Sequence, residues 1–319
     1  MSTKKILLAT EHGLLGKVPD GFTNMRVEFC WAKALDASFV PIDKVTHYPA
    51  DVCLFILPKK TRQYDKLPLY YKEVYPESKV GVIQEGPVDL WMDWSPYEQE
   101  EYFNVLHNVD LVLCHNRCDK NDIEQLLELD TNKVKVLPTL YDDELLKDID
   151  TTIKRDGILI SGNLSSWYGG MLALQCISKD YKGRIAIPRS GRMTDTEVQW
   201  CKEHNIEVLP WQDYKEFMKT MNTFKLCINL MPTLAAGTFN LGAAVLRIPC
   251  IGIAQLDTQN FHAYNLSLYV SKHYVNYNRV RLLIQEVYNN LHQHTYYTKE
   301  VHKVSITEAK KYLRQQIGV

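Results

Sequence analysis

Short apolar runs alternate with amphipathic stretches along the first half of the chain. The runs predict strands, and the stretches between them predict helices. Because most positions within each run are apolar, both faces of each strand are expected to be buried, as in a parallel sheet covered by helices. The predicted strands are Lys5–Thr10, Val52–Pro58, Lys79–Gln84, Leu111–His115 and Lys133–Pro138, and the predicted helices are Asn24–Leu35, Leu67–Val74 and the segments that begin at Ser95 and Asp119.

The alternation restarts after Asp142–Asp156, a charged stretch that predicts a linker. Further strands are then predicted at Gly157–Ser161, Arg184–Ile187, Ile206–Leu209, Phe224–Met231 and Pro249–Ile253. We therefore predict an α/β protein with two Rossmann-like domains, residues 1–150 and 151–300, whose parallel sheets face each other across a cleft. Three pairs have the spacing of a capping box and predict helix starts: Ser95 with Glu98, Thr194 with Glu197 and Ser305 with Glu308. The last pair predicts a helix within residues 301–319 that packs back on the first domain.

Charge is distributed unevenly between the two halves. Residues 1–150 contain 17 Lys and Arg against 26 Asp and Glu, whereas residues 151–319 contain 20 against 12. A basic second half suits a phosphorylated ligand. No apolar run approaches the ~20 residues that span a bilayer, and the eight cysteines form no CxxC pair. These features predict a cytoplasmic protein with reduced thiols and no membrane partner.

The segment Phe224–Ile253 reads as a strand, a loop of small residues, a short helix and another strand. The helix would direct unpaired N–H groups and the positive end of its dipole at the loop, which is the arrangement that binds anions. The candidate residues are Ala236, Gly237, Thr238 and Phe239. The alternative is a helix connection that uses small residues only for close packing.

A second glycine-bounded loop, Gly162–Gly170, follows the strand Gly157–Ser161. Gly162, Asn163 and Ser165 offer donors to an anion, and Trp167 and Tyr168 could stack on a base or a sugar. Both loops depart from the strict dinucleotide-binding and P-loop patterns.

Other polar residues follow the predicted strands of the second domain. Arg189 and Arg192 suit diphosphate oxygens, with solvated loop arginines as the alternative. Asp257 and Thr258 could accept the hydroxyls of ribose or sugar, with an Asx turn as the alternative.

The first domain offers candidate general bases where its strands end. Glu85 and Asp93 lie close to tryptophans after one strand, and His12 follows the first strand. Acidic turn residues and a surface histidine are the alternatives. Lys59, Lys60 and Arg62 form a basic loop that could contact a nucleic-acid backbone, although most such runs are solvated. We predict no metal site.

The residues Gly237, Thr238, Phe239, Gly242, Ala243, Ala244 and Arg247–Ile251 are similar to the donor-binding segment of GT-B glycosyltransferases. Many members of that family carry two glutamates flanking this segment. The corresponding positions here are Leu234 and Gly242, so the chain departs from the family in its mode of ribose binding.

The sequence resembles the phage-encoded, DNA-modifying members of this family more closely than it resembles other members. The matching segments are Gln84–Pro87, Asn163 with Ser165–Gly170, and Ala235–Phe239. This resemblance implies a metal-independent hexosyl- or pentosyltransferase that uses a nucleotide sugar, foremost a UDP-sugar. Its acceptor would be 5-hydroxymethylpyrimidine in double-stranded phage DNA, in the cytoplasm of an infected host cell.

Two alternative functions stay open at this point. One is a glycosyltransferase that acts on a glycan or another small acceptor. The other is a nucleotide-sugar epimerase or a non-transferring binding protein of the same fold. The sequence does not fix the oligomeric state, the sugar or the stereochemistry of transfer.

Overall fold

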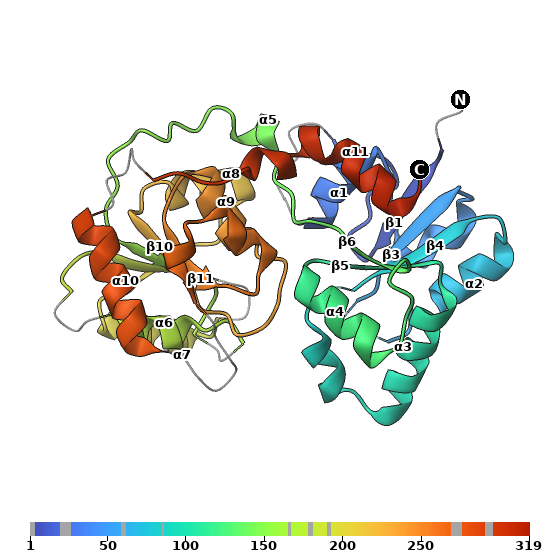
Figure 1. The fold of residues 1–319 in the computed structure, drawn as a ribbon, viewed down its shortest axis with the longest axis horizontal. Coiled ribbons are helices and arrows are strands. Elements are labelled where there is room, and N and C mark those ends of the chain that lie inside the picture. The colour runs from blue at the N-terminus through green and yellow to red at the C-terminus, as the bar shows by residue number, and fades with distance from the viewer. Residues whose placement is uncertain are drawn as a thin grey trace. The chain divides into compact units, whose positions relative to one another are not determined.

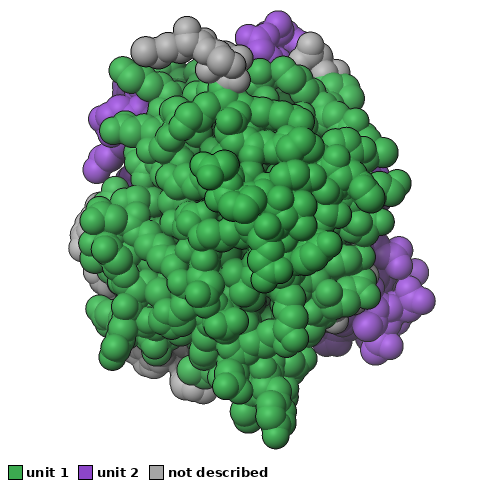
Figure 2. Space-filling view, turned by 90° about the vertical axis from the view of Figure 1, so that its right-hand side faces the viewer, with its two compact units in different colours: residues 1–142, 304–319 green, residues 143–303 purple. Residues whose placement is uncertain are grey.

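A computed structural model describes residues 4–19, 27–58, 62–84, 86–164, 167–177, 181–189, 193–268, 276–290 and 296–319. The chain forms two compact units (Figures 1 and 2). Each is an α/β unit built on a six-stranded sheet. Unit 1 comprises Met1–Asp142 and Val304–Val319, and unit 2 comprises Asp143–Lys303. The predicted α/β class with two parallel sheets is confirmed. The units divide after Asp142, earlier than the predicted division at residue 150.

All strands of unit 1 pair in parallel, in the order β2-β1-β3-β4-β5-β6. Their bounds are β1 Ile6–Thr10, β2 Ser38–Pro41, β3 Val52–Ile56, β4 Lys79–Ile83, β5 Leu111–Cys114 and β6 Val134–Val136. The predicted central strands are present, whereas β2 was not predicted because it is a short edge strand that ends in proline.

Helices cover both faces of this sheet, with α1 and α11 on one side and α3 and α4 on the other (Figure 1). The helical segments are α1 Val27–Leu35, η1 Ile42–His47, α2 Leu67–Val74, η2 Val88–Asp93, α3 Pro96–Asn108, α4 Arg117–Leu126 and α11 Ile306–Ile317. The short segment η6 Val301–Val304 spans the boundary between the two units. The last helix belongs to unit 1 because its side chains reach back to the start of the chain. Arg314 Nη2 donates to the Leu35 carbonyl oxygen at 3.0 Å.

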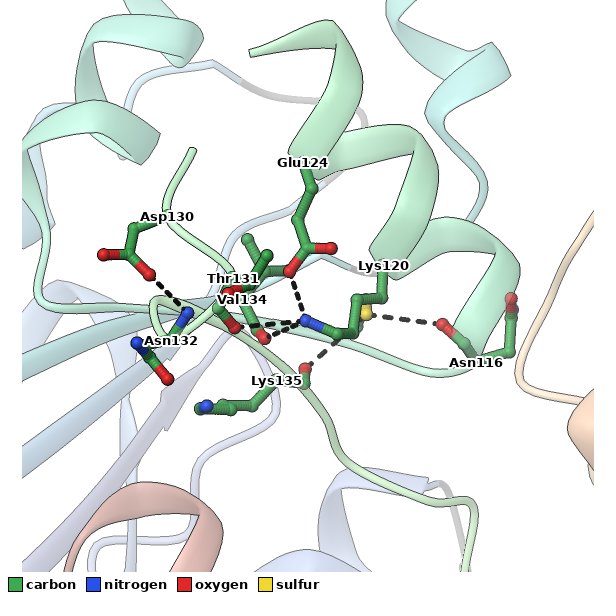
Figure 3. Close-up of polar contacts among 9 residues, drawn as sticks. Asn116, Lys120, Glu124, Asp130, Thr131, Asn132, Val134 and Lys135 are labelled. Atoms are coloured by element: carbon green, nitrogen blue, oxygen red, sulfur yellow. Dashed lines mark hydrogen bonds and ion pairs between the residues drawn. The ribbon is translucent and has the colours of Figure 1, made fainter. Parts of the chain in front are cut away.

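Local sequence signals set several helix ends. The predicted capping boxes of Ser95 with Glu98 and of Thr194 with Glu197 are both present. Lys120 of α4 donates to the carbonyl oxygens of Thr131 and Val134 and pairs with Glu124, which ties the helix to the start of β6 (Figure 3).

Unit 2 has a second parallel sheet, in the order β12-β11-β10-β7-β8-β9. Its strands are β7 Ile158–Ile160, β8 Ile185–Pro188, β9 Glu207–Leu209, β10 Leu226–Asn229, β11 Cys250–Ile253 and β12 Ser267–Leu268. Its helical segments are α5 Asp143–Leu146, α6 Gly170–Cys176, α7 Asp195–Glu203, α8 Tyr214–Met221, α9 Thr238–Val245, η3 Asp257–Phe261, η4 Tyr264–Leu266 and α10 Tyr277–Asn290. Within the described part of the chain, no helix is both long enough and apolar enough to cross a bilayer.

The charged stretch Asp142–Asp156 is more ordered than a simple linker. It contains α5, and its residue Arg155 is buried, with 6% of its surface exposed. Arg155 Nε donates to the Asn222 carbonyl at 3.0 Å, and Nη2 donates to the Leu246 carbonyl at 2.7 Å. The stretch is therefore anchored to the ends of α8 and α9 in unit 2.

Candidate functional site

The strand order of unit 2 creates a switch point between β7 and β10. The chain continues from β7 through α6 to β8 on one side, and from β10 through α9 to β11 on the other. The loops after these two neighbouring parallel strands therefore diverge at the carboxyl edge of the sheet. In open α/β sheets the crevice at such a point is where ligands bind.

Backbone contact joins the two loops. Gly169 in the loop after β7 has φ +65°, and a Cβ at this position would overlap the carbonyl oxygen of Leu230, the first residue after β10. Gly162 in the same loop also has a positive φ, +75°. The glycines thus permit a left-handed backbone and a close approach that a larger residue would prevent.

Gly169→Ala is expected to lower the free energy of unfolding by about 1–2 kcal/mol from the left-handed backbone alone. Separation of the loops by the new methyl group is expected to add to this loss. Urea unfolding measures the change in stability. Gly16→Ala is the control, because a Cβ at position 16 would have open space around it. Wild-type stability of the Gly169 variant would contradict the packing described here.

The helix α9 begins directly beyond the second loop. Gly237 is its N-cap, with φ +69°, and packs so closely on Thr258 that a Cβ would overlap the Thr258 hydroxyl oxygen. Thr238 is exposed and Ala236 and Phe239 are half-buried, so the first turn of the helix is accessible. The first amides of a helix lack partners within it, and the dipole favours an anion there.

The other predicted donor-binding residues lie along the same edge of the sheet. Trp167 is 37% exposed, Tyr168 is half-buried, and the buried Asn163 accepts the Gly170 N–H through its carbonyl oxygen at 3.1 Å. Arg189 directly follows β8 and its Nη2 lies 3.2 Å from Asp195 Oδ1. Asp257 begins η3. The predicted residues Ser165 and Arg192 are outside the described part of the chain.

Thr258 and Thr233 carry buried hydroxyl groups beside the α9 terminus and in the preceding loop. Thr258 is 5% exposed and Thr233 is 3% exposed. Neither hydroxyl oxygen has a hydrogen-bond partner among the described residues.

A buried polar network that the sequence analysis missed holds α9 in place. Asn240 in the first turn of α9 accepts from Asn229 at the end of β10, and donates to Gln259 Oε1 at 2.7 Å. His262 Nε2 lies 2.8 Å from the Asn240 carbonyl oxygen, and His262 Nδ1 lies 2.7 Å from the Tyr296 hydroxyl. Three of these residues, Asn240, Gln259 and His262, have exposed fractions of 0–2%.

The network determines which ring nitrogen of neutral His262 carries the hydrogen. The Asn240 carbonyl can only accept, so Nε2 carries it, and in the neutral ring Nδ1 then accepts from the Tyr296 hydroxyl. Burial lowers the pKa of His262 to about 4, because the charged imidazolium is poorly solvated there. His262 is therefore neutral at pH 7. The signal that could have found the network was polar residues placed inside otherwise apolar strand and helix segments.

Gly242 occupies one of the positions at which the sequence departs from the glutamates of GT-B enzymes. A Cβ at Gly242 would lie 3.0 Å from Met218 Sδ. Gly242 and Met218 are both buried, so this side of α9 faces apolar packing. A glutamate there would place an unpaired carboxylate in the core.

The predicted bases of unit 1 follow two strands of the same sheet, β1 and β4, which are separated by β3. His12 lies just after β1, where its Nε2 is 3.2 Å from Glu11 Oε1, and both side chains are more than a third exposed. Asp93 is exposed and ends η2, which follows β4. Glu85 lies outside the described residues, as do Lys59 and Lys60.

Arg62, predicted to contact nucleic acid, lies in a largely enclosed position. Its Nη2 is 2.7 Å from Asp65 Oδ2, and its guanidinium carbon is 3.5 Å from the centre of the Trp94 ring. The Arg62 side chain is 19% exposed. The guanidinium is thus occupied by a carboxylate and an aromatic face within the protein.

The described residues contain no cluster of three or more His, Cys, Asp or Glu side chains arranged to hold a metal. Metal-independent chemistry stays a prediction from the sequence.

The sequence matches no protein-family model and no curated protein, whereas solved structures match its fold. Anabaena HepE in complex with UDP and glucose superposes with a TM-score of 0.64 at 11% identity, over 98% of this chain and 95% of HepE. The pneumococcal O-GlcNAc transferase GtfA, in complex with UDP and GlcNAc, superposes with a TM-score of 0.58 at 12% identity, over 83% of this chain and 56% of GtfA. Sucrose-phosphate synthase from Thermosynechococcus elongatus superposes with a TM-score of 0.56 at 10% identity, over 88% of this chain and 76% of the synthase. The chain therefore has the GT-B fold of these glycosyltransferases.

Proposed function

We propose that this protein is a glycosyltransferase that moves a sugar from a nucleotide-sugar donor, foremost a UDP-sugar, to an acceptor hydroxyl. The observation that carries the proposal is the contact between the loops after β7 and β10, beside the accessible N-terminus of α9. Backbone N–H groups aimed at one point suit a diphosphate. The complexes of HepE with UDP-glucose and of GtfA with UDP and GlcNAc support a donor of this class.

In this proposal unit 2 holds the donor. The first turn of α9, Gly162, Asn163 and Arg189 bind the diphosphate, together with the Ser165 and Arg192 side chains suggested by the sequence. Trp167 and Tyr168 stack on the base or the sugar, and Asp257 and Thr258 accept sugar hydroxyls.

The acceptor oxygen attacks the anomeric carbon as the bond from that carbon to the diphosphate oxygen breaks. Glu85 or Asp93, with His12 as the further candidate, takes the acceptor proton. Negative charge develops on the departing diphosphate, where the α9 N–H groups and arginine side chains stabilise it. These groups supply the positive potential that a metal-independent mechanism needs.

The proposed acceptor is 5-hydroxymethylpyrimidine in DNA, supported by the resemblance to phage-encoded enzymes. Because Arg62 is already paired, backbone contact in this region would depend mainly on Lys59 and Lys60. Glycans or small molecules as acceptors, and donor binding without transfer, are the competing functions.

Mass spectrometry of hydroxymethylated DNA incubated with the protein and a panel of nucleotide sugars tests the proposal. A mass increase of one sugar per modified base is the expected result. Transfer to glycans but not to DNA would favour the small-acceptor function. Donor binding by calorimetry without any transfer would contradict the transferase assignment.

Arg189→Met is expected to weaken UDP binding by about tenfold or more, because a charge-assisted hydrogen bond to the diphosphate is lost. The matched control is Asp195→Asn. Asp195 is the ion-pair partner of Arg189 and is almost fully exposed, so this change removes the pair but keeps the guanidinium. Calorimetry with UDP should separate the two variants. Equal affinities for wild type and Arg189→Met would remove Arg189 from the donor site.

A further inference from the structure

One arginine joins three segments of unit 1. Arg62 and Asp65 lie between β3 and α2, Trp94 directly follows η2, and Tyr102 lies on α3. The guanidinium carbon of Arg62 lies 3.5 Å from the centre of the Trp94 ring and 5.2 Å from that of Tyr102. Asp65, which pairs with Arg62, is 1% exposed, so the cation and its carboxylate are both withdrawn from solvent.

The contacts continue from this arginine to Gln84 and Gly86, which follow β4. The Tyr102 hydroxyl donates to Gln84 Oε1, and Gln84 Nε2 donates to the Gly86 carbonyl oxygen at 3.3 Å. Gln84 is 3% exposed, and Gly86 has φ +85°. Residue 85 stands between them in the sequence. Tyr102 therefore holds one neighbour of this position directly, and the Gln84 side chain binds the other.

Aromatic packing keeps Tyr102 in place. The Trp91 and Trp94 rings meet the Tyr102 ring edge-on, with centres 5.9 and 5.2 Å away. Arg62 lies against both Trp94 and Tyr102, where a flat cation gains from the ring faces. Gln99 Nε2 donates to the Trp94 carbonyl at 2.9 Å and fixes the backbone of the same segment.

Asp65 shows how strongly the cluster depends on Arg62. Burial raises the pKa of the Asp65 carboxyl to about 6, the Arg62 charge lowers it, and the acidic groups of Glu101 and Glu98 on α3 raise it further. The Arg62 guanidinium is the cation in contact with this carboxylate. Removing one partner of such a pair leaves an uncompensated charge in a poorly solvated position.

We propose that Arg62 is a positioning residue of the transfer reaction, rather than a nucleic-acid contact. It holds Trp94 and Tyr102, and through the Tyr102 hydroxyl it holds Gln84, which directly precedes the candidate base Glu85 in the sequence. This inference rests on the proposed function for its effect on catalysis. To bind the Arg62 guanidinium, a DNA phosphate would have to displace Asp65 and separate the guanidinium from the Trp94 ring.

Tyr102→Phe is the most direct test, because it removes only the hydroxyl that holds Gln84 and keeps the ring packing. With Tyr102→Phe, kcat should fall by about tenfold to a hundredfold, as expected for a misplaced base. The dissociation constant for UDP should stay unchanged, because the proposed donor site lies in unit 2. The control is Tyr97→Phe on the same helix, whose side chain is 83% exposed.

Arg62→Lys keeps the charge but loses the planar fork and the stacking on Trp94. Its kcat should fall. Arg62→Met removes the charge, and its DNA binding should keep the salt dependence of the wild type. A flatter salt dependence for Arg62→Met, with unchanged kcat for Arg62→Lys, would overturn the proposal and return Arg62 to nucleic-acid contact.

Hydrogen–deuterium exchange provides a readout that needs no activity. Peptides spanning residues 84–95 should exchange about tenfold faster in both Tyr102→Phe and Arg62→Lys than in the wild type or Tyr97→Phe. Unchanged exchange would overturn the proposal. A wild-type protein that transfers no sugar would contradict the proposed function, and the exchange rates would still decide whether Arg62 and Tyr102 hold Gln84 and the residues after it.

Discussion

Replacing Arg155 with methionine is expected to lower the free energy of unfolding of unit 2 by about 3–5 kcal/mol, because several buried oxygens lose their donor at about 1–3 kcal/mol each. The wild-type guanidinium donates to the carbonyl oxygens of Asn222, Leu246 and Arg247, at 2.7–3.0 Å. It also donates to Asn222 Oδ1 at 2.6 Å and to the Thr151 carbonyl at 3.1 Å. Methionine fills similar space but leaves these buried acceptors without donors, which is costly.

The position of Arg155 explains how a buried cation is tolerated. Asn222 and Leu246 are the C-caps of α8 and α9, where unpaired carbonyl groups and the negative ends of the helix dipoles meet. Burial lowers the pKa of Arg155, and the fork of donors offsets the lost hydration. One side chain thereby joins the stretch before β7 to the far end of the proposed donor-binding helix.

Denaturant unfolding of Arg155→Met and Arg155→Lys measures this effect. Lysine should recover only part of the loss, because it has a single amino group for several separated oxygens. Arg279→Met is the control, since Arg279 is exposed and its guanidinium makes a longer bond of 3.3 Å to the Asn265 carbonyl. A loss for Arg155→Met no larger than that for Arg279→Met would contradict the role assigned to the buried guanidinium.

Acidification to pH 5 is expected to cost the wild-type protein about 2 kcal/mol through His262 alone. The folded-state pKa of His262 is about 4, below the ordinary value of 6.5, so the unfolded state binds more protons between these values. The stability supplied by neutral His262 is present above pH 6.5 and is lost as the pH falls toward 4. Protonation would also place a hydrogen on Nδ1, which now accepts from the Tyr296 hydroxyl.

The difference in free energy of unfolding between wild type and His262→Gln isolates this contribution. Burial raises the pKa of Asp65 in unit 1 to about 6, which makes stability fall as the pH rises through the same range. The subtraction cancels this opposing slope because both proteins keep Asp65. The advantage of the wild type over His262→Gln should shrink between pH 7.5 and pH 5, and a constant difference would contradict a neutral, buried His262.

UDP binding by the wild-type protein should weaken between pH 7.5 and pH 5, as its stability does, because His262 contacts Asn240 in the first turn of α9. Calorimetry at pH 7.5 and pH 5, in wild type and His262→Gln, links the buried network to the proposed donor site.

Much of the fold can be predicted from local patterns. The apolar runs predicted the central strands of both sheets, and the side-chain spacing at Ser95 and Thr194 predicted two helix starts that are present. Gly237 and Gly162, singled out as loop residues, both have positive φ. These features depend on residues that are close in sequence, so the sequence carries them directly.

The sequence alone determined the α/β class, the repeated alternation and the loops at the ends of the strands. Only the tertiary structure decided that β7 and β10 are neighbours, and that Gly169 meets Leu230. It also decided that Arg155 and Arg62 are enclosed, although charged residues in loops are usually solvated. The physical reason is that burial and charge compensation come from partners distant in the chain, such as Leu246 for Arg155 and Trp94 for Arg62, which no local spacing specifies.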